Sequence, residues 1–124
     1  MCWGDITING GTITATGGDS GAGIGSGGNN EEWYYDHLGD ICGVITINGG
    51  TITANGGSGA AGIGSGSYGY CEEVIIKNTV TRVTATKGSD DSCAIGNGSY
   101  GSCAMVTIGD KVGYIEESPY TYEP

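Results

Sequence analysis

The chain has 124 residues, enough for one domain, and we treat residues 1–124 as a single unit. It carries 14 acidic residues against four basic ones, which gives a net charge of −10. Binding to nucleic acids or anionic membranes requires clustered basic residues, so this composition argues against both kinds of protein. With 27 glycines, two prolines and no phenylalanine, it is predicted to form β-structure with many tight turns and a thin interior. No apolar stretch approaches the roughly 18 residues of a membrane-spanning helix. We therefore expect neither a nucleic-acid partner nor membrane insertion.

The first element in chain order is a repeat. Residues 6–15 read ITINGGTITA, and residues 45–54 read ITINGGTITA again. Over residues 6–27 the match to the segment 39 positions later holds at 18 of 22 positions. A third, degenerate copy spans residues 74–98, and a fourth begins at Val106. Self-similarity of this length predicts a stacked repeat architecture.

Each copy offers three short strand candidates, separated by Gly-Gly or Asn-Gly-Gly corners. Three strands and three corners in about 30 residues predict an all-β fold, a right-handed parallel β-helix of about four short triangular coils. An antiparallel sandwich or hairpin array is the alternative, but near-identical segments at a fixed offset favour stacking of like on like. The expected interior ladders are Ile6, Ile45, Val74 and Val106; Ile8, Ile47, Ile76 and Ile108; Ile13, Ile52 and Val83; and Ile24, Ile63 and Ile95.

A cysteine precedes each copy, so the coils begin near Cys2, Cys42, Cys71 and Cys103. The first coil holds an insertion at residues 29–38, and a tail at residues 114–124 ends the chain. Stacked cysteines on neighbouring rungs lie about 4.8 Å apart, within reach of a disulfide. Cys2–Cys42 with Cys71–Cys103, or Cys42–Cys71, are possible pairs, and a reduced ladder of buried thiols is the alternative. Cys93 aligns with Ala22 and Ala61, which predicts a small interior slot.

The repeat pattern Cys-x-x-[Ile/Val]-Thr-Ile-Asn-Gly-Gly-Thr-[Ile/Val]-Thr-Ala, followed by Gly-Ile-Gly-Ser-Gly, resembles Gly/Thr-rich β-helix arrays of secreted or surface proteins from gut anaerobic bacteria. In the broad sense these arrays are similar to the pectate-lyase-like solenoid superfamily. The ending at residues 118–124 resembles the way such arrays finish. The resemblance implies a fold and an extracellular or cell-surface location, and it implies little about activity.

The sequence has few features of an enzyme, and we expect no enzymatic activity. Asp5 aligns with Val44, Glu73 and Met105, so at most one pair of acids stacks beside the first strands. His37 is the only histidine, which makes a metal site or a Ser/His/Asp arrangement a poor fit. The Gly-Ile-Gly-Ser-Gly stretches carry no Lys and precede no helix, so a dinucleotide or phosphate loop is not indicated, and no cofactor is expected. The acidic doublets are interpreted as solvated surface rather than calcium ligands.

Aromatic residues give the best candidate for a binding site. Tyr68 and Tyr100 occupy equivalent corners, three residues before Cys71 and Cys103, and the insertion emerges near the same corner. Aromatic faces flanked by polar groups suit sugar rings. The alternative is that the insertion only covers an edge. The candidate residues are Trp33, Tyr34, Tyr35, Asp36, His37, Tyr68, Tyr70 and Tyr100.

The sequence therefore predicts a non-enzymatic bacterial surface or secreted module for adhesion or carbohydrate binding, with a polysaccharide or host glycan as partner. Solenoid ends expose unpaired backbone, so the rival is a structural protein that associates end to end into a filament. A weaker alternative is ice binding through outward threonine ladders. One of these ladders is Thr14, Thr53 and Thr84, while Arg82 and Ile75 interrupt the other two.

Overall fold

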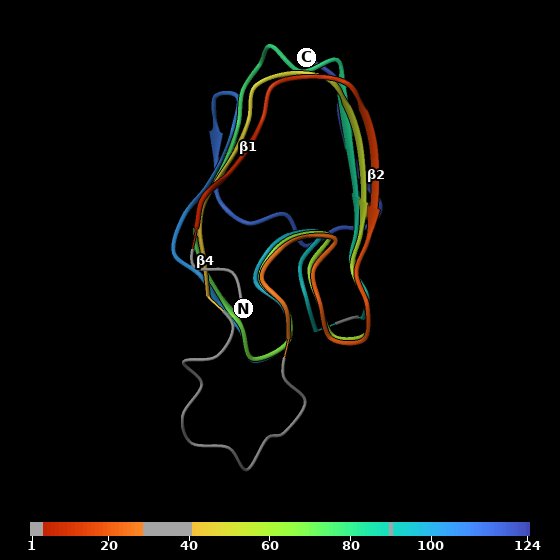
Figure 1. The fold of residues 1–124 in the computed structure, drawn as a ribbon, viewed down its shortest axis with the longest axis vertical. Helices are drawn as coiled ribbons and strands as arrows, with labels where there is room; N and C mark the ends of the chain where they lie inside the picture. Colours follow the sequence, from red (N-terminus) through yellow and green to blue (C-terminus); the bar gives the residue numbers. More distant parts are fainter. Residues whose placement is uncertain (1–3, 29–40, 90) are drawn as a thin grey trace.

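The computed structural model describes residues 4–28, 41–89 and 91–124. The described part is built of strands and turns, and it contains no helix that could span a membrane. Figure 1 looks along the stack of coils, so that equivalent segments of successive coils overlie one another. The parallel β-helix predicted from the repeat is confirmed.

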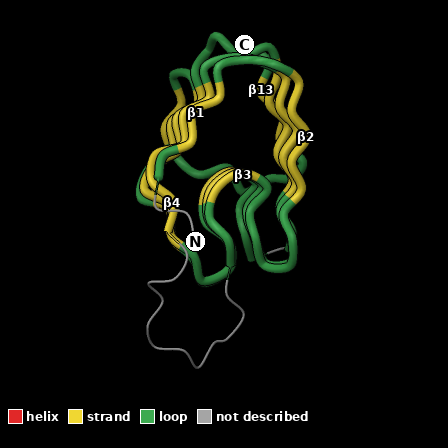
Figure 2. Tube along the Cα trace, in the orientation of Figure 1, coloured by secondary structure: helices red, strands yellow, loops and turns green. Residues whose placement is uncertain are grey.

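Three sheets run along the stack. The six-stranded sheet contains β1 (Ile6–Ile8), β4 (Ile41–Ile47), β7 (Tyr70–Ile76), β10 (Ser102–Cys103), β11 (Val106–Ile108) and β12 (Lys111–Val112). The four-stranded sheet contains β2 (Thr12–Thr16), β5 (Thr51–Asn55), β8 (Arg82–Thr86) and β13 (Tyr120–Tyr122). The three-stranded sheet contains β3 (Ile24–Gly25), β6 (Ile63–Gly64) and β9 (Ile95–Gly96). In cross-section the coil is elongated, and the third sheet turns inward between the other two (Figure 2).

The register follows the repeat. Ile13 pairs with Ile52, and Ile52 pairs with Val83, so that equivalent residues lie directly above one another. All four predicted ladders are formed in this way. The interior side chains of the second and third coils are completely buried, including Ile45, Ile47, Ile52 and Ile63. Burial of these stacked branched side chains is the main source of stability, because one coil alone cannot bury its apolar face.

The C-terminal segment from β12 onward, which includes the tail at residues 114–124, covers the last rung. β12 turns back to pair antiparallel with β11, and β13 pairs antiparallel with β8. Between them Ile115 bridges to Ile95 of the third sheet and is buried. This C-terminal segment therefore contributes a partner to the last strand of every sheet. This reversal of direction ends the parallel stack and satisfies backbone groups that an open rung would leave exposed.

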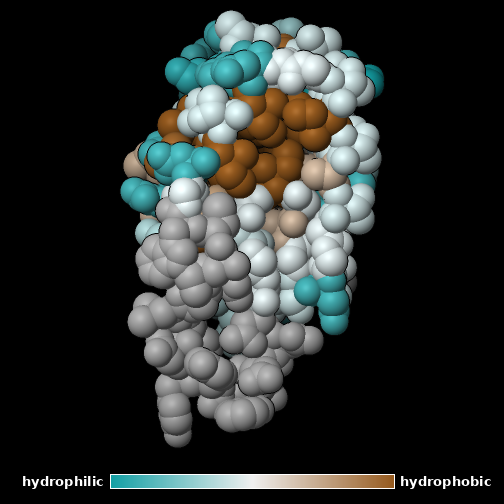
Figure 3. Space-filling model, viewed as in Figure 1, coloured by the Kyte–Doolittle hydropathy of each residue, from teal (hydrophilic) through white to brown (hydrophobic). Residues whose placement is uncertain are grey.

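The first coil presents a different end. β1, β2 and β3 are edge strands of their sheets in the described structure. The inward residues of β1 and β2 are only half-buried, whereas the equivalent residues of the second coil are fully buried; Ile24 of β3 is buried. Figure 3 views this end and reveals an apolar area framed by polar side chains. The partly buried apolar residues here are Ile6, Ile8, Ile13 and Ala15.

Candidate functional site

Five of the predicted site residues lie outside the described part of the chain. They belong to the insertion at residues 29–38, and they are Trp33, Tyr34, Tyr35, Asp36 and His37. The other three, Tyr68, Tyr70 and Tyr100, are described, and they define what we call the tyrosine surface.

Tyr68 and Tyr100 stack on each other. Their ring centroids are 5.1 Å apart and their planes differ by 14°. The backbone produces this arrangement, since each tyrosine follows a Gly-Ser step and is closed by the same turn. Gly69 N–H donates to Gly66 O in one coil, and Gly101 N–H donates to Gly98 O in the next. Equivalent turns in neighbouring coils therefore place the two tyrosine rings one above the other.

Both stacked tyrosines have left-handed backbone conformations, with φ of 62° for Tyr68 and 56° for Tyr100. This region is rare for bulky side chains and costs about 1–2 kcal/mol relative to the right-handed region. Glycine is the residue that such a corner favours on stability grounds. A bulky aromatic side chain at both equivalent corners is the kind of outlier that accompanies functional sites.

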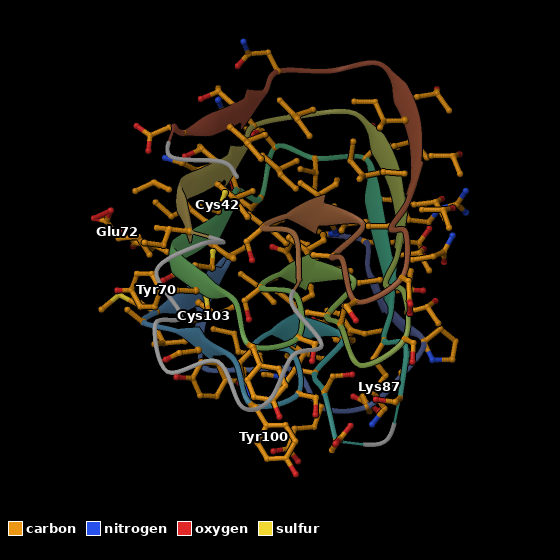
Figure 4. The ribbon with its side chains drawn as sticks, turned by 60° about the horizontal axis from the view of Figure 1, so that its bottom comes forward. Cys42, Tyr70, Glu72, Lys87, Tyr100 and Cys103 are labelled. Atoms are coloured by element: carbon orange, nitrogen blue, oxygen red, sulfur yellow. The ribbon has the colours of Figure 1, made fainter. Side chains whose placement is uncertain are left out.

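Two of the three rings of the tyrosine surface are exposed to solvent, and Tyr68 is half-buried. The Tyr100 side chain is 79% exposed, and Tyr70 is 37% exposed. Tyr70 and Glu72 project outward from β7, as Figure 4 shows. Tyr70 lies in register with Ser102 on β10. Tyr70, Glu72 and Ser102 thus expose a phenol, a carboxylate and a hydroxyl on one face of this sheet, beyond the corners that carry Tyr68 and Tyr100.

Buried serines hold the segment beneath the tyrosine surface. Ser26 Oγ accepts from Gly66 N–H at 3.0 Å, and one coil later Ser65 Oγ accepts from Gly98 N–H at 2.8 Å. Ser67 Oγ donates to Ser99 O at 3.3 Å. The sequence pattern predicts a strand at Gly-Ile-Gly-Ser-Gly and assigns no partner to its serine. Recurrence of serine after the buried isoleucine was the available signal that this hydroxyl has a structural partner.

The cysteines form a ladder inside the solenoid. Cys42 pairs in register with Cys71, and Cys71 with Cys103, while Cys2 lies outside the described residues. The three described members are buried thiols. Hydrogen bonds with Cys103 and Cys42, together with burial, raise the pKa of Cys71 far above its ordinary range. Cys71, buried and protonated, therefore packs as a small apolar side chain, whereas its hydrogen bond lowers the pKa of the Cys103 thiol.

Other predicted features are placed as follows. Asp5 Oδ1 accepts from Val44 N–H at 2.8 Å, which gives this carboxylate a role at the coil junction. Arg82 lies 3.9 Å from Glu123 in an exposed ion pair. Thr14, Thr53 and Thr84 are in register on the outer face. Among the residues the structure describes, no group of three or more His, Cys, Asp or Glu is arranged to hold a metal ion.

Comparison with known proteins agrees with this architecture. The family model described as a beta helix repeat matches residues 6–28 and 45–67, which are the first two coils. No curated protein and no solved structure matches the chain.

Proposed function

We propose that the chain, which is a parallel β-helix repeat protein, is a non-enzymatic module that binds carbohydrate and serves adhesion. The observation that carries this proposal is the Tyr68–Tyr100 stack, with an exposed Tyr100 ring held in a left-handed conformation. The proposed location is extracellular or at the cell surface, and it rests on the resemblance of the repeat to surface arrays.

The chemistry of the tyrosine surface supports a sugar ligand. One face of the Tyr100 ring packs on Tyr68, and its large exposed area leaves aromatic surface for a ligand. The C–H side of a pyranose packs on such a ring, while nearby hydroxyl and carboxylate groups bind the sugar hydroxyls. Ser102 and Glu72, both exposed beside Tyr70, supply such groups. The rigid turns beneath the rings reduce the entropy lost on binding.

Replacing Tyr100 separates binding from stability. Tyr100→Gly removes the ring and also relieves the left-handed strain, so the free energy of unfolding should change by less than about 1 kcal/mol. Binding to polysaccharides on a glycan array, followed by titration of the best hit, should weaken about tenfold or more. Val112→Ala, at an exposed site on the C-terminal cap, is the matched control and should leave binding unchanged. Unaltered binding by Tyr100→Gly, or no glycan binding by the native chain, contradicts the proposal.

Association through the first coil is the second candidate function. Thr51 N–H donates to Gly11 O and Asn48 N–H donates to Ile8 O, so by register the N–H groups of Thr12 and Asn9 point away from the second coil. With half-buried isoleucines beside them, these groups form an edge that pairs readily with another chain. The capped C-terminal rung argues against an open head-to-tail filament. Two copies meeting through their first coils would instead form a closed dimer.

A charge on the first coil tests this association. The side chain of Ile13 points inward at the open end, where a lysine can still direct its ammonium to solvent. Ile13→Lys should therefore abolish dimers without unfolding the monomer, whereas Thr14→Lys on the outer face of the same strand should retain them. Sedimentation velocity over a range of concentrations measures the outcome. A native chain that stays monomeric at every concentration rules this candidate out.

A further inference from the structure

A pocket of about 370 Å³ lies where the C-terminal tail meets the third coil. The sequence analysis predicts no binding role for the residues that line it, and none of them belongs to the tyrosine surface. The tail contributes Tyr114 and Glu116, and the third coil contributes Lys87, Asp91, Cys93 and Asn97. Lys87 is labelled in Figure 4, on the same lower side of the molecule as Tyr100.

Asp91 is held in one orientation at the rim of the pocket. Ser89 Oγ donates to Asp91 Oδ1 at 2.6 Å, and Ser99 Oγ donates to Oδ2 at 2.7 Å. These hydrogen bonds, that of Ser89 first, hold the pKa of the Asp91 carboxyl below its usual value. Each carboxylate oxygen has a second lone pair available. Asp91 is therefore a fixed anion with acceptor capacity left for a ligand.

Tyr114 forms a fixed aromatic wall. Its hydroxyl donates to Cys103 O at 2.8 Å, and its ring packs over Gly96, where a Cβ would come within 3.0 Å of Cδ1. The Asn97 amide is also restrained, because Cys93 Sγ donates to Oδ1 at 3.5 Å and Nδ2 donates to Gly98 O at 3.4 Å. Burial raises the pKa of the Cys93 thiol, which keeps it a neutral part of the wall.

From this geometry we infer that the pocket binds a single hexose ring, neutral or bearing an amine. An aromatic wall, a preoriented carboxylate and an amide are the groups that recognise the apolar face and the hydroxyls of a sugar. Two carboxylates against one ammonium give the lining a net charge of −1, which favours an amino sugar and disfavours a sugar acid. The carbohydrate class rests on the proposed function.

The pocket and the tyrosine surface are joined through one hydrogen bond. Ser99, which binds Asp91, immediately precedes Tyr100 in the chain. The rim of the pocket and the exposed Tyr100 ring are thus anchored by adjacent residues of one turn. For a polysaccharide that spans both, the tyrosine surface would stack on the sugar rings and the pocket would select one sugar unit.

Titration of the full chain with D-glucosamine, D-glucose and D-glucuronate, followed by NMR chemical shifts, tests the inference. Glucosamine should bind best and glucuronate worst. Asp91→Asn should weaken glucosamine binding about tenfold, because a neutral amide replaces the charged acceptor of the hydrogen bond. Asp110→Asn makes the same charge change at an exposed turn outside the pocket and should have no effect. Glu116→Gln, a second variant without a structural hydrogen bond in the described contacts, should weaken glucosamine more than glucose.

No shift with any of the three sugars overturns the inference, as does equal weakening by Asp91→Asn and Asp110→Asn. Failure of the pocket is distinguishable from failure of the proposed function. If polysaccharide binding depends on Tyr100 but is indifferent to Asp91 and Glu116, the module binds glycans at the tyrosine surface and the pocket has no part in it. If hexoses shift the pocket residues while no polysaccharide binds, only the larger proposal is lost.

Discussion

Gly64→Ala should destabilise the solenoid by about 4 kcal/mol or more, a large effect for a single added methyl group. Gly64 lies in β6 with φ of 135°, a conformation that side chains rarely adopt. A Cβ built there would lie 1.9 Å from Gly96 O in the next coil. Both atoms belong to the main chain, so the clash cannot be relieved by a rotamer change. Chemical denaturation followed by circular dichroism measures the loss.

The matched control is a glycine of the same repeat in a different environment. Gly10 lies at a corner of the first coil, where a Cβ would meet nothing within 4 Å and φ is not positive. Gly10→Ala should leave stability unchanged or raise it by about 0.5 kcal/mol, because alanine restricts the unfolded chain. A comparable loss in both variants would mean that general glycine flexibility, rather than the close approach of neighbouring coils, determines the effect.

The third sheet explains why so few large residues are needed. Gly25, Gly64 and Gly96 all have φ near 135–139° and pack main chain on main chain through successive coils. The short strands β3, β6 and β9 can thus turn inward, with Ile24, Ile63 and Ile95 filling the space they enclose. At these positions glycine lets neighbouring backbones come into close contact, so that large side chains are not needed to fill the space. Its abundance in the sequence is a requirement of this packing and not a sign of disorder.

The repeat made most of the register predictable from sequence. An offset of 39 placed Ile13 above Ile52, and the structure has that pair. The tail was less accessible, because it has no second copy to compare with. Antiparallel pairing of Tyr120–Tyr122 with β8 depends on hydrogen bonding at an exposed edge, which the side-chain pattern does not encode. The pocket lined by Tyr114 and Asp91 depends on this tail and was missed for the same reason.

The candidate site was predictable only in part. Alignment of Tyr68 with Tyr100 follows from their equal distance to Cys71 and Cys103, so their proximity could be expected. Their left-handed conformation could not, since local propensity opposes it and the surrounding turns impose it. Asp91 accepts hydrogen bonds from Ser89, two residues before it, and from Ser99, eight residues after it, and the equivalent coils have no acid at this position. Stacking of equivalent residues predicts the ladders, but it does not predict hydrogen bonds between residues at different positions of the repeat.

Truncation of the same isoleucine in two coils should have unequal costs. Ile8 and Ile47 are equivalent positions of identical decapeptides and pair with each other. Ile47 has coils on both sides and is 0% exposed, so Ile47→Ala leaves a closed cavity and should cost about 4 kcal/mol. Ile8 is half-buried and has a coil on one side only. Ile8→Ala should cost about 1–2 kcal/mol, because solvent fills the space and less apolar area is lost.

Urea denaturation of both variants at low protein concentration measures the two costs. Their difference reports whether the first coil is open in solution, because only the cover on the N-terminal side distinguishes the two sites. Equal costs contradict an open end and mean that another segment buries Ile8 as fully as Ile47. If the cost of Ile8→Ala instead rises with protein concentration, the cover is a second copy, since association stabilises the buried state by mass action. The behaviour of this one side chain then decides between a solenoid that ends at its first coil and one that continues into a partner.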